Sequence, residues 1–423
     1  MKFAFITPRY GAEFSAGAEH ACRLLAEQVA KRHDVDVLTT TARDSATWKN
    51  EYSEGSDRVR GALVRRFAVS AVPEQSAFTE LSRRLREGPR CRPDELQWVR
   101  HQGPYSSGLF EHLKRQHRSY DALVFFGLWH PLTVNGLEIA PERSVLFPHL
   151  QLRRELRFDL WADVLTSARA VGYFSSPERR LVHAYVGVAP QFEEMIGIGV
   201  DPPSQQTYPR HQQDPADVIT AEDDSTGDDE LMLDESYLAG RGVPFRRRHR
   251  LYDNFALYGG RVEPDNGCEE MLDYFDSFAA NNRVDDMRLV LMGLKMMTVP
   301  EAPYLRLAGV LPDRERMTAY EAALVTIAPD PDDLLAQSLL ESLAVGTPVL
   351  ATASNEAAIE HCRRANAGLY YSNREEFVGA LSELRSPALR ERMGENGRRY
   401  IRQHHQWDAV IGRFERLVGR VRR

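Results

Sequence analysis

The chain has 423 residues, of which 43% are hydrophobic, and its formal net charge is −7. This length predicts two domains, and the sequence has no run of about 18 apolar residues that would predict a transmembrane helix. Ten Asp or Glu residues and no Lys or Arg lie between Gln212 and Tyr237. The rest of the chain therefore carries about +3, which argues against a nucleic-acid-binding protein.

The cysteines and the N-terminal residues indicate the cellular compartment in which the protein is expected. The four cysteines are far apart in the sequence and show no CxxC spacing: Cys22, Cys91, Cys268 and Cys362. This pattern predicts a reduced, cytoplasmic protein without a zinc site. The first residues read directly as a strand and lack the apolar region of a signal peptide.

In the first half, short apolar runs alternate with helical patterns. Phe3–Thr7 reads as a buried strand, Ala16–Lys31 has the apolar spacing of a helix, and Val35–Thr41 reads as a strand again. Further strands are expected at Ala62–Val69, Ala122–Phe126, Ser144–Pro148, Val171–Ser175 and Met195–Val200. Continuous apolar strands that alternate with helices predict a parallel sheet covered on both faces.

The same pattern restarts after the acidic stretch. Strands are expected at Phe255–Gly259, Leu289–Met292, Leu305–Val310, Leu324–Ala328, Val349–Ala351 and Gly368–Tyr371. Two doubly wound α/β domains in tandem place a ligand crevice at the carboxyl ends of both sheets. We expect an N-terminal domain at 1–201, a disordered acidic insertion at 202–248 and a C-terminal domain at 249–398. The insertion's composition fits both a solvated spacer and a regulatory segment.

Two carboxylates lie eight residues apart in Asp333-Leu-Leu-Ala-Gln-Ser-Leu-Leu-Glu341. The second lies on a short apolar helix that ends at Gly346-Thr-Pro348 before a strand. An acid in the loop can reach the hydroxyls of a sugar, and an acid inside the helix can accept both hydrogen bonds of a ribose diol. The helix N-terminus between them offers N–H groups to a diphosphate. Taken alone, the segment also fits an ordinary surface loop that leads into a half-buried helix.

Four other residues have the chemistry of a phosphate or sugar site. Arg261 lies in the turn after a strand and suits a phosphate, whereas Asn266 in the same turn donates a hydrogen bond but carries no charge. Gly17 opens a helix and lets the backbone approach a phosphate closely. His149 ends the apolar strand at 144–148. Structural roles remain open for both Gly17 and His149.

Together these motifs resemble the retaining glycosyltransferases of family 4, whose sugar-nucleotide site has two glutamates separated by seven residues. Four further segments resemble the same family: Phe174–Arg180, Ile196–Asp201, Cys362–Tyr371 and Met393–Trp407. The resemblance implies the GT-B fold, in which two Rossmann-like domains face each other across a cleft. It also implies that a C-terminal helix, at 399–423, crosses back to the first domain.

The resemblance implies a role for each site residue. Glu341 would bind the ribose and Asp333 would orient the sugar, while Arg261, with weaker help from Asn266, would hold the diphosphate. Gly17 would close the phosphate pocket from the first domain, and His149 would act on the transferring sugar. The donor site is completed by Gly293, Leu335, Ala336 and Gln337. We therefore expect the catalytic residues to be His149, Asp333 and Arg261.

The sequence departs from the family at three of these positions. The family has glutamate at 333, lysine at 266 and usually glycine at 336. The implied function is retaining transfer of a hexosyl group from a nucleoside diphosphate sugar to an acceptor hydroxyl, in glycan, cell-surface polysaccharide or glycoconjugate synthesis. No metal or other cofactor is expected, although Asp330-Pro-Asp332 contains the D-x-D pattern of some metal sites. The departures leave open a non-catalytic binding or scaffold protein, and a phosphorylase or a sugar-phosphate synthase is a further alternative.

Basic residues gather in one part of the first half: Arg83, Arg84, Arg86, Arg90, Arg92, Arg100, Lys114, Arg115 and Arg118. They fit either a peripheral membrane patch near a lipid-linked acceptor or ordinary solvated helix faces. The expected partners are the sugar donor and a glycan, lipid-linked or small-molecule acceptor, without nucleic acid. The expected location is the cytoplasm, with contact to the inner face of the membrane left open.

Overall fold

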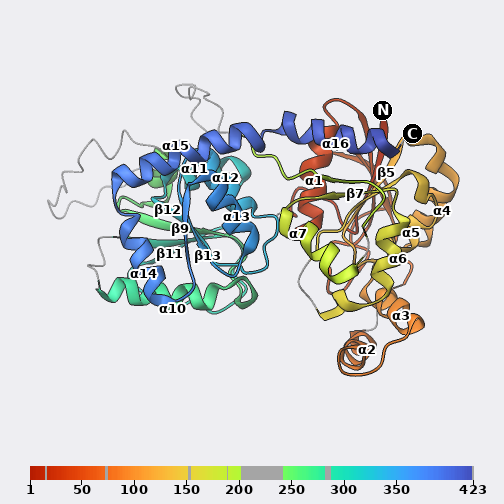
Figure 1. The fold of residues 1–423 in the computed structure, drawn as a ribbon, viewed down its shortest axis with the longest axis horizontal. Coiled ribbons are helices and arrows are strands. Elements are labelled where there is room, and N and C mark those ends of the chain that lie inside the picture. Colours follow the sequence, from red (N-terminus) through yellow and green to blue (C-terminus); the bar gives the residue numbers. More distant parts are fainter. Residues whose placement is uncertain are drawn as a thin grey trace, which may run out of the picture.

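The computed structural model describes residues 1–14, 17–71, 75–150, 154–187, 189–201, 242–281 and 287–421. Figure 1 shows two α/β domains side by side, with the C-terminal helices running across both. Residues 202–241 of the expected acidic insertion lie outside the described residues. Its last residues are not a disordered segment, because they form the helix Val243–His249, whose Phe245 is buried in the second domain.

The first domain is built around a sheet of eight described strands. Its strands are β1 (Lys2–Ile6), β2 (Asp34–Thr40), β3 (Gly55–Val59), β4 (Ala62–Phe67), β5 (Ala122–Phe126), β6 (Ser144–Phe147), β7 (Ala170–Tyr173) and β8 (Glu193–Met195). Its helices are α1 (Gly17–Val29), α2 (Gln75–Glu87), α3 (Arg92–Gln102), α4 (Ser107–Gln116), α5 (Pro131–Leu137), α6 (Leu160–Ser167) and α7 (Ser176–Leu181). The strand order is β3-β4-β2-β1-β5-β6-β7-β8, and all neighbours are parallel except β3 and β4.

Among the described residues, the second domain has one sheet of six strands. Its strands are β9 (Phe255–Gly259), β10 (Arg288–Met292), β11 (Leu305–Gly309), β12 (Val325–Ala328), β13 (Val349–Thr352) and β14 (Gly368–Tyr371). The helices of the second half are α9 (Val243–His249), α10 (Cys268–Asn281), α11 (Asp313–Ala322), α12 (Gln337–Val345), α13 (Glu356–Ala365), α14 (Arg374–Glu383), α15 (Pro387–His404) and α16 (Trp407–Val421). The strand order is β11-β10-β9-β12-β13-β14, and all pairs are parallel.

Alternate residues of the central strands enter different cores. Phe3 and Phe5 of β1 pack with α1 and α16 on one face of the first sheet. Ala4 and Ile6 of the same strand pack with residues of α2 to α6 on the other face. Because both faces are covered, nearly every residue of these strands is apolar and buried. The expected two doubly wound domains are therefore confirmed.

The C-terminal helices connect the domains. α15 contacts α12 and α13 of the second domain, whereas α16 contacts α1 and the strands β6 to β8 of the first. The helix that crosses back therefore begins at Trp407, later than the expected residue 399. Between α15 and α16, the carbonyl of His405 accepts a hydrogen bond from the backbone N–H of Val200 at 2.9 Å. That carbonyl is thus occupied by the linker between the domains.

Two strand predictions need correction. A strand was expected at Met195–Val200, but β8 ends at Met195, because the backbone turns at Gly197 with a φ of 69°. The edge strand β3 was not expected, since its sequence Gly-Ser-Asp-Arg-Val lacks an apolar alternation and most of it is exposed. It is held by antiparallel pairing with β4.

Candidate functional site

Each sheet reverses its strand order beside its first strand. In the first domain β1 lies between β2 and β5, and in the second β9 lies between β10 and β12. Doubly wound sheets bind ligands beyond the carboxyl ends of their strands at such a switch point. The predicted residues follow these carboxyl ends: Gly17 after β1, His149 after β6, Arg261 and Asn266 after β9, Gly293 after β10, and Asp333–Glu341 after β12.

Glu341 lies in the second turn of α12, and its relative exposure is 5%. Its Oε1 accepts hydrogen bonds from Nη2 of Arg316 at 2.7 Å and from Nε2 of Gln337 at 3.0 Å. Burial raises the pKa of the Glu341 carboxyl, and Arg316 opposes that shift. Within the described residues no hydrogen bond reaches Oε2, so this oxygen is available to a ligand's hydroxyl.

A chain of ion pairs leads from Glu341 to the first domain. Nη2 of Arg316 lies 3.6 Å from Oδ1 of Asp313, and Oδ2 of Asp313 lies 2.8 Å from Nη1 of Arg60, in the β3–β4 turn. Arg60 in turn lies 3.8 Å from Glu27 of α1. Burial tends to raise the pKa of Asp313, but Arg60 and Arg316 hold it below its usual value. The carboxylate at the second switch point is thus linked electrostatically to α1.

The loop before α12 is closed by Asp333. Its Oδ1 accepts the backbone N–H groups of Leu335 at 3.1 Å and Ala336 at 3.0 Å. Aspartate favours such bonds to the backbone two or three residues ahead, and its side chain is one methylene shorter than glutamate's. The N–H of Ala336, expected to bind a diphosphate, is therefore already bonded to Asp333.

Ala336 has a φ of 50°, in the left-handed region. A residue with a Cβ is disfavoured there by about 1–2 kcal/mol. This gives a physical reason for the glycine that the resembled family usually has at this position. This residue directly precedes α12, which begins at Gln337.

The turn after β9 is also satisfied internally. The carbonyl of Arg261 accepts hydrogen bonds from Nδ2 of Asn266 at 3.0 Å and from the Tyr258 hydroxyl at 2.7 Å. The Arg261 guanidinium is half-exposed and lies 2.9 Å from Glu263. Asn266 therefore stabilises the turn, while the Arg261 guanidinium lies at its surface.

Two glycines let the loops of the second domain approach one another. A Cβ on Gly267, whose φ is 72°, would lie 2.3 Å from the carbonyl oxygen of Pro329, in the loop after β12. A Cβ on Gly293 would lie 1.9 Å from the carbonyl oxygen of Gly260. The turns after β9, β10 and β12 thus meet, and they bring Gly293, Arg261 and Asn266 to the same edge as the Asp333 loop.

In the first domain, α1 begins at Gly17 with a φ of 74°. Glu19, in the first turn of α1, accepts a hydrogen bond from Nε of Arg9 at 3.0 Å and lies 2.9 Å from its Nη2. Burial, then Arg23, then Arg316 of the second domain lower the pKa of His20 to about 3. Residues of α1 also share a hydrophobic cluster with Leu335, Ala336 and Leu339 at the start of α12.

His149 directly follows Pro148 at the end of β6, and its φ of 45° is in the left-handed region. Burial lowers the pKa of its imidazole to about 4, which Glu19 opposes. The ring is therefore neutral at neutral pH. Strained backbone of this kind is common at functional sites, where the surrounding structure fixes a side chain's direction.

Glu178 holds the two loops beside His149. Its Oε2 accepts the N–H of Phe174 at 2.8 Å and its Oε1 accepts the N–H of Leu150 at 3.2 Å. Burial raises the pKa of Glu178 to about 7, and the backbone N–H groups oppose that rise. This buried carboxyl therefore positions the residue next to His149.

Sequence reasoning missed Arg316 and Glu178. A signal for Glu178 existed, because Ser175-Ser-Pro-Glu178 has the spacing of a capping box, and Ser175 does cap α7. For Arg316 there was none, since its partner Glu341 lies 25 residues further along the chain.

Most of the expected basic cluster is paired. Arg83, Arg84, Arg86, Arg92 and Lys114 each lie within an ion-pair distance of a carboxylate. In the described part of the chain, no group of three or more His, Cys, Asp or Glu is arranged to hold a metal ion. Nor is any helix in the described ranges long and apolar enough to span a membrane.

The whole chain is similar to solved glycosyltransferase structures. Sucrose-phosphate synthase from Thermosynechococcus elongatus matches with a TM-score of 0.63 and 16% identity, covering 98% of both chains. HepE from Anabaena, solved with UDP and glucose, matches with a TM-score of 0.64 and 12% identity, covering 99% of both. The chain has the GT-B fold. These identities are low enough that the likeness establishes the fold alone.

Sequence comparison adds two partial matches. Residues 279–416 match the family model described as glycosyl transferase-like. A "glycosyltransferase 1 domain-containing protein 1" of Xenopus tropicalis is 30% identical over 87 residues, which are 20% of this chain and 24% of that protein. The match therefore spans about a quarter of the relative. The family-model match begins in α10 and ends within α16.

Proposed function

We propose that the protein is a retaining glycosyltransferase that moves a hexosyl group from a nucleoside diphosphate sugar to an acceptor hydroxyl. The observation that carries this proposal is the buried carboxylate of Glu341, at the start of α12 and at the switch point of a GT-B second domain. Its unbonded Oε2 suits one hydroxyl of a ribose, and displacement of Gln337 would free Oε1 for the other.

The turns around Glu341 suit the rest of a donor. Arg261 would contact the diphosphate, together with amides at the start of α12 and with weaker help from Asn266. The N-terminal amides of a helix favour an anion. Asp333 would orient the sugar through Oδ2, since both of its bonds to the loop use Oδ1. Gly17 would approach the phosphates from the first domain, where its lack of a side chain leaves room.

The proposed reaction exchanges one bond at the sugar's anomeric carbon for another. The bond to the diphosphate oxygen breaks, the acceptor oxygen bonds to the same face, and the acceptor's proton passes to the departing diphosphate. Positive groups near that diphosphate stabilise its growing charge. A neutral His149 could exchange a hydrogen bond with a hydroxyl of the transferring sugar. The proposal includes no metal or other cofactor.

A uridine nucleotide is the first donor to test. Two solved structures of HepE from Anabaena are complexes of that protein, one with UDP and glucose and the other with UDP-glucose. We further propose a cytoplasmic role in glycan, polysaccharide or glycoconjugate synthesis, with a glycan, lipid-linked or small-molecule acceptor. Membrane contact through the basic cluster has less support, because five of its side chains are already paired.

A second candidate function is non-catalytic binding. Three predicted donor groups have partners inside the protein: Glu341 with Arg316, Asp333 with its own loop, and Asn266 with the Arg261 carbonyl. A protein retained as a binding or scaffold subunit would tolerate such internal bonds. It would bind a nucleotide sugar weakly and would not transfer the sugar.

Binding and transfer by matched variants separate the two functions. Binding of UDP-, GDP-, ADP- and dTDP-sugars is measured for the wild type, Glu341→Gln and Glu356→Gln. Glu356 is an exposed glutamate on α13 and serves as the control. We expect one donor to bind selectively, Glu341→Gln to weaken it at least about tenfold by loss of a charged hydrogen bond, and the control to be unchanged. Equal binding by all three proteins would refute the donor site, and binding without hydrolysis or transfer would favour the non-catalytic function.

A further inference from the structure

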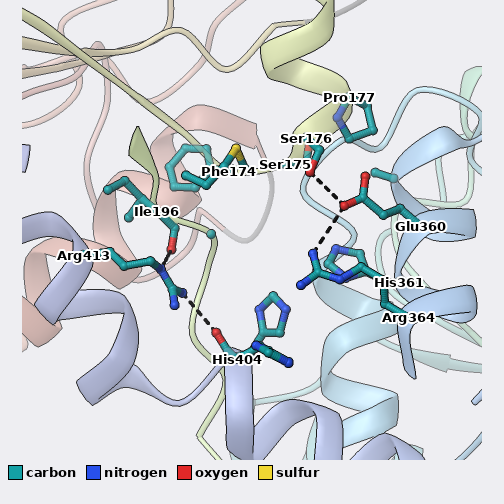
Figure 2. Close-up of a pocket in the computed structure, with 14 residues that line it drawn as sticks. Phe174, Ser175, Ser176, Pro177, Ile196, Glu360, His361, Arg364, His404 and Arg413 are labelled. Carbon is teal, nitrogen blue, oxygen red and sulfur yellow. Dashed lines mark hydrogen bonds and ion pairs between the residues drawn. The ribbon is translucent and has the colours of Figure 1, made fainter. Parts of the chain in front are cut away.

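A cavity of about 220 Å³ lies between the two domains, at the junction of α15 and α16. Figure 2 shows its lining, which comes from the segments after β7 and β8, one face of α13, the α15–α16 junction and Arg413 of α16. None of the predicted donor-site residues lines it. The cavity therefore requires an explanation of its own.

The lining carries more positive than negative charge. The guanidinium groups of Arg364 and Arg413 border the cavity, and Glu360 is its one carboxylate. Oε1 of Glu360 accepts hydrogen bonds from the Ser176 hydroxyl at 2.8 Å and from Nη1 of Arg364 at 3.4 Å. Its Oε2 lies 3.7 Å from Arg180. The carboxylate is thus compensated from both domains, and Arg413 forms hydrogen bonds only to the carbonyls of Ile196 and His404 among the described residues.

Three histidines border the same cavity in their neutral form, namely His361, His404 and His405. Burial, and then the cations nearby, lower the pKa of His405 to about 4, and both Arg364 and Arg413 contribute. The same two guanidinium groups lower the pKa of His404. The field of both arginines therefore converges on this part of the cavity, where it would favour an anion.

The hydrogen bonds fix which nitrogen of His361 is protonated. Nδ1 of His405 lies 2.9 Å from the carbonyl of Ile198 and must donate to it, so Nε2 of the neutral ring is an acceptor. The Tyr400 hydroxyl, 3.3 Å from that Nε2, must donate to it. Tyr400 then accepts from Nδ1 of His361 at 2.8 Å, and Nε2 of His361 carries a lone pair. His361 is only 8% exposed, and its Nε2 has no hydrogen-bond partner within the described residues.

We propose that this cavity is a binding site for a phosphate or phosphate monoester that still carries a proton. The anion's oxygens accept hydrogen bonds from Arg364 and Arg413, and its hydroxyl donates to Nε2 of His361. A sulfate or a phosphodiester offers the same oxygens but no hydroxyl, so the lone pair of His361 repels it. Arg364 lies on α13 of the second domain, and Arg413 lies on α16, which packs on the first domain. The bound anion therefore links the two domains.

The test uses the full chain and small anions as probes. The ring resonances of His361 are followed by NMR at pH 7 and constant ionic strength, with assignment by His361→Gln. Inorganic phosphate, methyl phosphate, dimethyl phosphate and sulfate are added in turn. We expect saturable shifts with inorganic phosphate or methyl phosphate, and at least tenfold weaker binding of sulfate and dimethyl phosphate. Tighter binding of inorganic phosphate than of methyl phosphate would identify free phosphate as the ligand. The opposite order would identify a phosphate monoester.

Two variants on α13 provide a matched pair. Arg364→Gln removes a lining guanidinium, whereas Arg363→Gln removes its neighbour, which stacks on Tyr370 outside the cavity. Phosphate binding should weaken at least tenfold in the first and stay unchanged in the second. Equal binding of sulfate and phosphate, equal effects of the two variants, or no shift of His361 at millimolar phosphate would each overturn the proposal. Because Arg364 is half-exposed, its loss should leave the fold intact.

Discussion

Arg316 donates a hydrogen bond of 2.7 Å to the buried carboxylate of Glu341, 25 residues away in the sequence. The Arg316 side chain is 19% exposed and that of Glu341 is 7% exposed. Removing one partner of a buried pair leaves the other charge without compensation, which costs more than the pair itself contributes. The Arg316–Glu341 pair therefore affects the stability of the fold as well as the binding of a sugar donor.

Arg316→Met should lower the free energy of unfolding by about 3 kcal/mol, because it leaves Glu341 buried without its cation. Urea denaturation measures the change. Arg248→Met is the control, since Arg248 pairs with the neighbouring Glu315 at the surface and should lose less than about 1 kcal/mol. The double variant Arg316→Met/Glu341→Met should be more stable than Arg316→Met alone. A double variant that is less stable would contradict the argument.

Asn266→Lys should raise donor turnover, because a lysine would place positive charge beside the leaving diphosphate. One such stabilising group is worth up to about 10²–10³ in rate, and we expect at least a tenfold gain. The loss of the Asn266–Arg261 bond should lower stability by only about 1 kcal/mol. Asp265→Lys brings a lysine to the neighbouring position and is the control. No gain over that control would favour the non-catalytic function.

The order of the elements could be predicted from the sequence, but several contacts at the site could not. Apolar runs such as 122–126 and 255–259 identify central strands because both faces of a parallel sheet are covered. The polar edge strand β3 shows no such pattern and depends on its pairing partner. The spacing of residues 333 and 341 predicts them as donor-site residues. Their side-chain partners could not be predicted, since Arg316 joins Glu341 only through tertiary packing.

Glu178→Gln should destabilise the protein by about 1–3 kcal/mol, because one carboxyl oxygen that accepts a buried N–H becomes an NH₂ group that cannot. The His149 ring resonances should shift as well, since the adjoining Leu150 is bonded to the side chain that changes. Urea denaturation and NMR measure the two effects. Glu356→Gln, at an exposed ion pair, should change neither. If Glu178→Gln left the protein as stable as the wild type, the carboxyl would not be needed for this loop.

His149 should remain neutral well below pH 6.5. Burial lowers its pKa to about 4, so the unfolded chain binds this proton more readily than the folded one. The contribution of His149 to stability is therefore present above about pH 6.5 and is lost as the pH falls toward 4. An NMR titration of its Cε1–H, assigned with His149→Gln, should show a midpoint below pH 5. A midpoint near 6.5 would mean that the ring is exposed to water.

Phe414→Ala should destabilise the first domain by about 3–5 kcal/mol. Phe414 lies on α16, is fully buried, and packs with its ring centroid 5.5 Å from that of Phe3 and 5.9 Å from that of Phe5. Thermal denaturation followed by near-ultraviolet circular dichroism measures the loss. Arg420→Ala on the exposed side of α16 should have an effect below about 1 kcal/mol. Similar effects of the two would mean that α16 contributes little to the first domain.

The position of α16 has a consequence for protein synthesis. One face of the first domain is completed by residues at the far end of the chain, so a nascent first domain cannot bury Phe3 and Phe5 against their final partner. At translation rates of roughly 5–20 residues per second, this apolar face waits tens of seconds for Trp407–Val421 to leave the ribosome. During that interval Phe3 and Phe5 lack their contact with Phe414. Native packing of this face of the first domain therefore has to wait until α16 has been synthesised.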